Sequence, residues 1–159
     1  MTLQSGTVAN SVLSPNAMAM HPNGSLAYVA DGGSGAVAAF NVNASTGGLS
    51  VKGYYNSGSG TNAVAIHPSG QFLYVSTSNG VTLFAITASG SLTAMGAATP
   101  AGTVPQGLAL DGAGAHLYVT DLGSGTVSAF AIDASTGALS QLGAALATGS
   151  QPSGVALTP

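Results

Sequence analysis

The stretch Val64-Ala65-Ile66-His67-Pro68-Ser69-Gly70-Gln71-Phe72-Leu73-Tyr74-Val75 decides the fold of this chain, because the chain contains it three times in closely related form. One copy begins 46 residues earlier, at Met18, and another begins 44 residues later, at Leu108. A fourth copy starts at Val155. Repeats of about 40–50 residues indicate a fold in which one supersecondary unit is stacked on copies of itself.

Each repeat predicts four short antiparallel strands. Apolar residues alternate with small or polar ones, and turn-forming residues recur about every 8–12 positions, a spacing typical of an antiparallel meander. In the first repeat the expected strands are 17–20, 26–30, 36–42 and 49–55. The intervening turns, such as Asp31-Gly32-Gly33-Ser34-Gly35, are rich in residues that tolerate turn dihedrals. No useful helical periodicity appears, so the sequence predicts an all-β fold.

Aligned apolar positions form columns through the repeats. Tyrosine recurs on the second strand and phenylalanine on the third, while leucine opens the fourth. The columns are Tyr28, Tyr74 and Tyr118; Phe40, Phe84 and Phe130; and Leu49, Leu92 and Leu139. Aromatic columns of this kind predict a buried layer between neighbouring sheets. Small alanines on the first strand suit a strand crowded against a central axis.

Four motifs carry a resemblance to a known family. They are Pro105-Gln106-Gly107-Leu108-Ala109-Leu110, the Leu-Tyr-Val at 73–75 and 117–119, the Gly-x-Val-x-x-Phe at 125–130, and the Ser-Thr-Gly-x-Leu-Ser at 45–50 and 135–140. These repeats resemble the blades of the lactonase-like and YVTN-type seven-bladed β-propellers. The resemblance implies four-stranded antiparallel blades, but a fold of this kind carries many functions.

Residues 1–159 are expected to form a single repeat domain. Complete repeats cover about 15–60, 61–103 and 104–150, and a partial repeat covers 151–159. Residues 3–9 match the fourth strand of a repeat, which predicts three complete blades, an N-terminal fourth-type strand and a C-terminal first-type strand. Three blades cannot close a propeller ring. Either the chain is part of a longer propeller, or separate copies cover the open edges.

Ionisable residues are scarce. The acids are Asp31, Asp111, Asp121 and Asp133, Lys52 is the only strong base, Arg, Glu and Cys are absent, and the net charge is −3. Nucleic acid is excluded as a partner, because phosphate neutralisation requires clustered basic residues. No apolar run approaches the roughly 18 residues needed to span a membrane. The N-terminus lacks the features of a signal peptide, yet a composition rich in Ser, Thr, Asn, Gly and Ala favours an extracellular or periplasmic location.

One face is expected to collect polar groups. It carries the starts of the first strands and the turns between second and third strands. The candidate ligand-binding residues there are Asn16, Asn62, Gln106, Asp31 and Asp121, and Asn79 and Ser153 map to the same face. Near a central opening they could form a polar ring that binds a glycan or another small molecule. The alternatives are Asx turns for the acids and a hydrogen-bonded ladder for the amides.

The opposite face carries His21 and His67 in His-Pro-x-Gly turns. Zinc requires three or four converging ligands, whereas the third repeat places Asp111 at this position. We therefore expect these histidines to hydrogen-bond within their turns, and we expect no metal and no cofactor.

Catalysis is the less favoured class. A phosphorylated lactone would need cationic groups, the chain contains no Gly-x-Ser-x-Gly elbow, and no catalytic residue can be named. The sequence favours a non-catalytic structural or interaction module that forms a homo-oligomer through blades or terminal strands, as a ring or a filament. The alternatives are a fragment of a lactonase-like propeller enzyme and a propeller that binds a carbohydrate or another small ligand.

Overall fold

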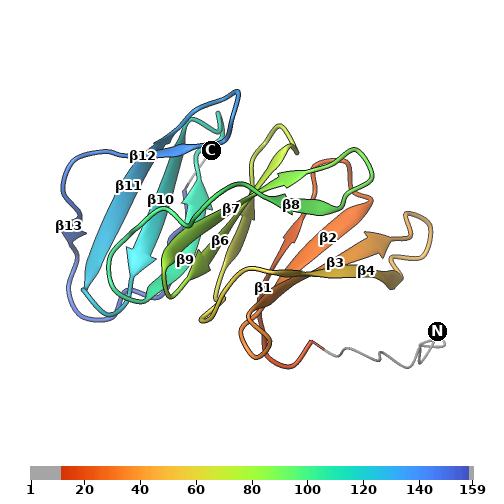
Figure 1. Cartoon of the computed structure of the whole chain (residues 1–159), viewed down its shortest axis with the longest axis horizontal. Helices are drawn as coiled ribbons and strands as arrows, with labels where there is room; N and C mark the ends of the chain where they lie inside the picture. The colour runs from red at the N-terminus through yellow and green to blue at the C-terminus, as the bar shows by residue number, and fades with distance from the viewer. Residues whose placement is uncertain (1–11, 158–159) are drawn as a thin grey trace.

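A computed structural model describes residues 12–157 of the chain, and this range contains strands and no helix. The strands form three antiparallel sheets that lie side by side (Figure 1). We call these sheets blades 1, 2 and 3 in chain order. Blade 1 is a meander of β1 (Pro15–Met20), β2 (Leu26–Asp31), β3 (Ala36–Val42) and β4 (Leu49–Asn56). The expected all-β, propeller-type architecture is confirmed.

Blades 2 and 3 repeat the same strand order. Blade 2 contains β5 (Val64–Ile66), β6 (Phe72–Thr77), β7 (Gly80–Ile86) and β8 (Leu92–Ala94). Blade 3 contains β9 (Pro105–Leu110), β10 (His116–Asp121), β11 (Thr126–Ile132), β12 (Leu139–Gln141) and β13 (Leu146–Ala147). Both β12 and β13 pair with β11, so they are two halves of one interrupted outer strand.

The terminal strands expected from the sequence have different outcomes. Residues 3–9, the N-terminal fourth-type strand, lie outside the described residues. The described part of the C-terminal segment forms no strand as far as residue 157. It nevertheless runs beside β9, because a Cβ placed on Gly107 would lie 3.1 Å from the Ser153 carbonyl oxygen. This is the place of the first strand of a following blade, although no ladder forms there.

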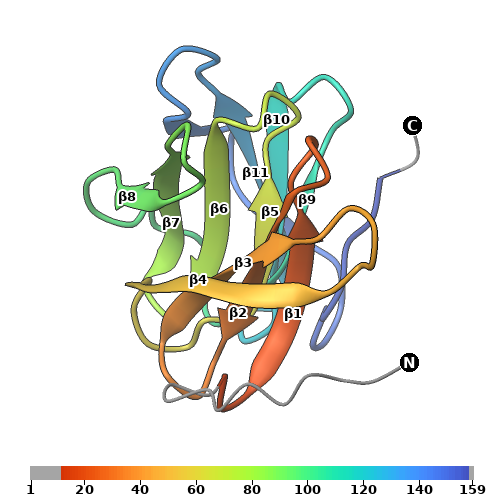
Figure 2. The ribbon, with the colours of Figure 1, turned by 90° about the vertical axis from the view of Figure 1, so that its right-hand side faces the viewer.

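The first strands of the blades lie together. β1 contacts β5 and β5 contacts β9, and Figure 2 shows these three strands grouped in the middle of the molecule. Small side chains such as Ala17, Ala19 and Ala65 allow this close approach. The polar groups at the ends of these strands are thereby brought onto two common faces of the molecule.

Each blade turns its tyrosine toward the next blade and its phenylalanine toward the previous one. Tyr28 and Phe84 are buried in one apolar cluster between blades 1 and 2. Tyr74 and Phe130 are buried in the equivalent cluster between blades 2 and 3. The two interfaces are therefore built from the same pair of columns.

The buried tyrosine hydroxyls bond across these interfaces. Tyr28 Oη donates to the Gly90 carbonyl oxygen at 2.9 Å, and Tyr74 Oη donates to the Gly137 carbonyl oxygen at 2.9 Å. Gly90 and Gly137 have positive φ, and a Cβ at either would collide with Leu26 or Phe72. Burial, with a smaller contribution from nearby Tyr55, raises the pKa of Tyr28 to about 12. Burial also raises the pKa of Tyr74, so both hydroxyls remain protonated donors.

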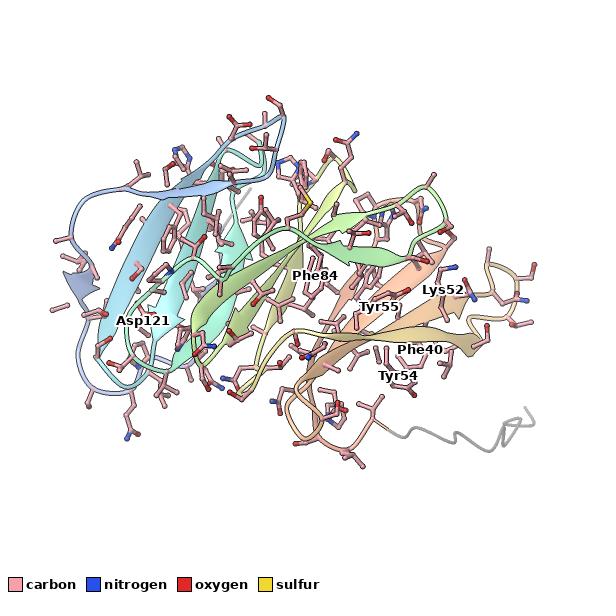
Figure 3. All side chains as sticks on the ribbon, viewed as in Figure 1. Phe40, Lys52, Tyr54, Tyr55, Phe84 and Asp121 are labelled. Atoms are coloured by element: carbon pink, nitrogen blue, oxygen red, sulfur yellow. The ribbon has the colours of Figure 1, made fainter. Side chains whose placement is uncertain are left out.

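The sequence predicted that all six aromatic residues of the two columns are buried, and this is wrong for two of them. Phe40 and Tyr118 are only half-buried. Phe40 pairs with Ala27 on the surface of blade 1 that faces away from blade 2, and Tyr118 pairs with Ala129 on the outer surface of blade 3. Figure 3 shows Phe40 and Tyr54 on the opposite side of β4 from Phe84. Neither residue has a blade opposite it among the described residues.

Phe84 and Phe40 provide a matched test of this packing. We expect Phe84→Ala to lower the free energy of unfolding by about 3–5 kcal/mol, because it empties a buried aromatic site. Phe40→Ala, at the same strand position with one side open, should cost about 1 kcal/mol. Urea denaturation of both variants measures the difference. Equal losses would contradict the assignment of Phe84 to a blade interface.

Tyr74 and Tyr118 test the hydrogen bond separately from the packing. Tyr74→Phe keeps the ring but leaves the buried Gly137 carbonyl without its donor, and we expect a loss of about 1–2 kcal/mol. Tyr118 makes no inter-blade hydrogen bond within residues 12–157, so Tyr118→Phe should leave the free energy of unfolding nearly unchanged. Thermal and urea unfolding of the two variants provide the comparison, and a neutral Tyr74→Phe would contradict the role of its hydroxyl.

Candidate functional site

The candidate residues gather where the first strands begin. We call this side of the molecule the start face; it carries the beginnings of β1, β5 and β9 and the turns β2–β3, β6–β7 and β10–β11. These turns contact the connections that lead into the first strands: Gly32 N–H donates to the Ser14 carbonyl, and Gly123 N–H donates to the Thr103 carbonyl. The meander therefore brings the expected amides and acids onto one face.

The amide column forms a ladder between blades. Asn16 Nδ2 donates to the Thr61 carbonyl oxygen at 3.0 Å, and Asn62 Nδ2 donates to the Pro105 carbonyl oxygen at 3.1 Å. Each amide thus reaches the residue just before the amide of the next blade. Gln106, the third member, makes no side-chain hydrogen bond within residues 12–157. The ladder is one of the two alternatives that the sequence allowed, and it leaves Gln106 with a free amide.

Asp31 is fully enclosed by donors. Its carboxylate accepts the backbone N–H groups of Leu13, Ser14 and Gly33 and the hydroxyl of Ser34. Burial of Asp31 opposes ionisation, but these hydrogen bonds outweigh it and hold the pKa of Asp31 below its ordinary value. Asp31 therefore clamps its turn to the connection before β1, as the Asx-turn alternative predicted.

Asp121 occupies the same place in blade 3 with a different set of partners. It is fully buried, and its Oδ2 accepts the hydroxyls of Ser128 at 2.6 Å and Thr126 at 3.4 Å. Its Oδ1 is buried and has no hydrogen-bond partner among the residues that the structure describes. Gly102 packs directly on this carboxylate, since a Cβ at Gly102 would lie 2.5 Å from Asp121 Cγ. Two turns of similar sequence thus give their carboxylates different hydrogen bonds: Asp31 is bonded at both oxygens, and Asp121 is bonded at one.

Blade 2 places a threonine at this position. Thr77 pairs with Gly80 across a turn that is shorter than that of Asp31, which pairs with Ala36. Thr77 Oγ1 donates to the Gly80 carbonyl and accepts the N–H of Asn79. The sequence grouped Asn79 with Asp31 and Asp121, but Asn79 lies in the turn after Thr77 and is exposed. The residue of blade 2 that is equivalent to the two acids is Thr77.

Serine and threonine hydroxyls make buried hydrogen bonds that sequence reasoning missed, and the one from Ser76 to Gln106 joins blades 2 and 3. Ser76 Oγ accepts the N–H of Ala63 and donates to the Gln106 carbonyl oxygen. Thr61 Oγ1 lies 2.7 Å from Ser57 Oγ, and both side chains are buried. The available signal was a small hydroxyl residue within an otherwise apolar strand, which is common and identifies no partner.

The histidines on the opposite face form a second ladder. His21 Nε2 lies 2.9 Å from the Gly70 carbonyl oxygen, and His67 Nε2 lies 3.0 Å from that of Gly114. The backbone N–H groups of Asn23 and Ser69 donate to the Nδ1 atoms of the two rings. Nδ1 is therefore the acceptor and Nε2–H the donor in both rings. The expected turn hydrogen bonds are present, together with a bond to the next blade.

Positive charge is remote from the start face. Lys52 projects from β4, the outer strand of blade 1, and Figure 3 shows it far from Asp121 in blade 3. Within residues 12–157 no three His, Cys, Asp or Glu side chains converge in a way that could hold a metal ion. The carboxylates of Asp31 and Asp121 are buried, so the groups that the start face presents to solvent include the amides of Asn16, Asn62 and Gln106, and amides recognise hydroxyl-bearing ligands.

Repeated four-stranded blades grouped around their first strands define a β-propeller protein. A family model described as "Lactonase, 7-bladed beta-propeller" matches residues 9–156. The chain therefore belongs to the lactonase family of seven-bladed β-propellers. Among curated protein sequences, none matches this chain.

Solved structures agree with this family. A protein from Lactobacillus plantarum aligns over 88% of this chain and 43% of its own length, with 26% identity and a TM-score of 0.80. A candidate 6-phosphogluconolactonase from Bacteroides uniformis aligns over 80% of this chain and 38% of its own length, with 25% identity and a TM-score of 0.73. The periplasmic gluconolactonase of Pseudomonas aeruginosa aligns over 87% and 41%, with 24% identity and a TM-score of 0.75. The chain spans roughly two fifths of these proteins.

These comparisons correct the functional prediction. The expectation of a non-catalytic, self-assembling module is wrong, because the matched family and its structural neighbours are lactonase-like propellers. The argument for self-assembly was the shortage of strands for a closed ring. The three blades instead correspond to part of the ring of larger relatives, which supports the alternative of a lactonase-like fragment. Separately, no helix within residues 12–157 is long and apolar enough to cross a membrane.

The Asp31 clamp makes stability sensitive to acid. Because the pKa of Asp31 is lower in the folded state than in the unfolded chain, its contribution is present above about pH 4 and is lost as the pH falls through the folded-state value. Asp31→Asn should cost about 1–3 kcal/mol at neutral pH and should remove this part of the acid dependence. Urea denaturation between about pH 2 and pH 7 should show the two curves converging at low pH. A constant difference across that range would contradict the clamp.

Proposed function

We propose that this chain acts in lactone hydrolysis, as the three-blade part of a lactonase-type propeller. The observation that carries this proposal is the family match over residues 9–156. In the reaction, water adds to the lactone carbonyl carbon, the ring C–O bond breaks with its oxygen taking a proton, and the hydroxy acid that forms ionises to a hydroxy carboxylate and a proton. The start face would hold the substrate.

The polar residues of the start face support a sugar-like substrate. Gln106 has a free amide. The side-chain amides of Asn16 and Asn62 are held in fixed positions by the hydrogen bonds of the ladder. Amides can both donate to and accept from ring hydroxyls. We assign Asn16, Asn62 and Gln106 to substrate binding, with Asp31 and Asp121 beneath them holding the turns of this face.

The charges favour a lactone without phosphate. Asp31 and Asp121 are the acids of the start face, while Lys52 lies on an outer strand. A phosphate dianion would meet negative charge there and no cation from these three blades. We therefore propose an aldonolactone such as glucono-δ-lactone as the substrate class.

We also propose an extracellular or periplasmic location. A chain with a single strong base and four acids, rich in Gly, Ser, Thr and Ala, fits a secreted protein better than a cytosolic one. One structural neighbour carries the description of a periplasmic gluconolactonase.

Acid release measures the proposed activity directly. In a pH-stat assay we expect the chain to accelerate hydrolysis of glucono-δ-lactone above its spontaneous rate, and to act less well on the 6-phosphorylated lactone. Gln106→Ala should raise KM by about tenfold, the equivalent of one lost hydrogen bond. Lys52→Ala is the matched control and should leave the rate unchanged.

A binding measurement distinguishes the second candidate function, a small-ligand-binding propeller, which the free amide of Gln106 favours. Titration with the corresponding lactam, followed by NMR of the side-chain amides of Asn16, Asn62 and Gln106, reports binding without turnover. Shifts without hydrolysis would identify a binder. If the titration gives no shifts and the assay shows no hydrolysis, both assignments are contradicted.

A further inference from the structure

The connection before β9 differs from its counterpart in blade 1 by the orientation of one peptide. In blade 1 the N–H of Ser14 donates to Asp31 Oδ1 at 2.7 Å, and the carbonyl of Ser14 accepts the N–H of Gly32. In blade 3 the carbonyl of Val104 accepts the N–H of Leu122 in the same way. The preceding peptide, between Thr103 and Val104, points in the opposite direction.

Two observations establish that reversal. The carbonyl oxygen of Thr103 faces the turn and accepts the N–H of Gly123 at 2.9 Å, so the N–H of Val104 faces away from Asp121. The φ angle of Val104 is +54°, whereas Ser14 does not have a positive φ. Reversal of a peptide plane changes ψ of the residue before it and φ of the residue after it, which is the difference seen here.

Blade 2 has the reversed peptide with residues that suit it. Ser59 accepts the N–H of Ser78 as Thr103 accepts that of Gly123, and the residue in the left-handed position is Gly60, with φ +65°. The residue in place of the acid is Thr77, whose hydroxyl is satisfied inside its own turn. In blade 2 the reversed orientation therefore leaves the side chain in the acid's position with its hydrogen bonds made.

Blade 3 combines the acid of blade 1 with the peptide orientation of blade 2. The acid lacks the donor that it has in blade 1, and the peptide orientation lacks the glycine that it has in blade 2. Val104 is β-branched, which disfavours a left-handed backbone. Asp121 Oδ1 is buried without a donor, although the turn around Asp31 shows that two backbone N–H groups can reach that oxygen. Both defects would be removed by the same movement.

We propose that the Thr103–Val104 peptide is a two-state switch that flips to cap or release Asp121 Oδ1. In the observed state the oxygen is free and Gly123 N–H bonds to Thr103. In the flipped state the N–H groups of Val104 and Gly123 both turn to Asp121 Oδ1, and the Thr103 carbonyl turns outward. The flip breaks one hydrogen bond and forms two, while the bond from Leu122 to Val104 is retained. It alters the environment of the Asp121 carboxylate, which lies across the β9–β10 ladder from Pro105, the neighbour of Gln106, without moving a strand.

Backbone relaxation dispersion on the intact chain tests the switch. We expect exchange on the microsecond-to-millisecond timescale at the amides of Thr103, Val104 and Gly123. The amides of Leu13, Ser14 and Gly33, in the equivalent turn with a capped carboxylate, should show none. Flat dispersion at Thr103, Val104 and Gly123 at several temperatures, with one set of resonances, would overturn the proposal.

Substitutions taken from the other blades identify the cause of the exchange. Asp121→Thr introduces the residue that blade 2 uses, and Val104→Gly introduces the counterpart of Gly60. Each should hold the observed orientation and abolish the exchange. Val104→Ser, the residue of blade 1, should move the population toward the flipped state and shift the amide of residue 104 toward the position of Ser14. Exchange that persists unchanged in both Asp121→Thr and Val104→Gly would overturn the proposal, and Val104 is exposed enough to be replaced even if Asp121→Thr fails to fold.

Discussion

A tyrosine hydroxyl bonded to a backbone carbonyl inside an apolar interface holds neighbouring blades in register. Tyr28 and Tyr74 place their rings in the two interfaces, and each hydroxyl reaches a glycine carbonyl in an outer turn of the next blade. The rings exclude water, so the carbonyl has no alternative donor and the bond fixes how far one blade slides along the other. The ladders of the first strands depend on this alignment. Without it, Asn16 and His21 would not meet the carbonyls of the following repeat.

The repeats and aromatic columns were sufficient to predict the fold. Strand 36–42 was predicted with its observed bounds, and the expected strands 17–20, 26–30 and 49–55 lie within β1, β2 and β4. The burial of Phe40 and Tyr118 could not be predicted in the same way. Alternation along a strand shows which side chains share a face, but whether another sheet covers that face depends on contacts that the local pattern does not encode. The local pattern also did not show that three blades correspond to part of the ring of larger relatives. The functional prediction, which was based on a shortage of strands for a closed ring, was therefore wrong.

The position of the candidate residues was predicted, and the bonding of Asp31 and of the amides follows alternatives that the sequence offered. The sequence placed Asn16, Asn62, Gln106, Asp31 and Asp121 on one face, and the meander brings them there. It gave no sign that Asp31 and Asp121 differ, because their turns share the pattern Asp-x-Gly-Ser-Gly. The difference arises from the connection that packs on each turn. Residues 13–14 and 103–104 lie about 17–18 positions before their carboxylates and follow different backbone paths.

The three side-chain ladders between blades also have a direction. Asparagine, histidine and tyrosine each donate from an earlier blade, and a main-chain carbonyl of the next blade accepts. The acceptor belongs to the backbone, but the acceptors of the histidines and tyrosines are glycines with positive φ at which a Cβ would collide with the earlier blade, so the receiving blade needs glycine at these positions. A duplicated copy of such a blade would arrive with its own donors and would find acceptors already present in whichever blade follows it. Growth of the array by gene duplication therefore requires no coordinated substitution at the new junction, as long as the duplicated blade keeps both its donor side chains and its acceptor glycines.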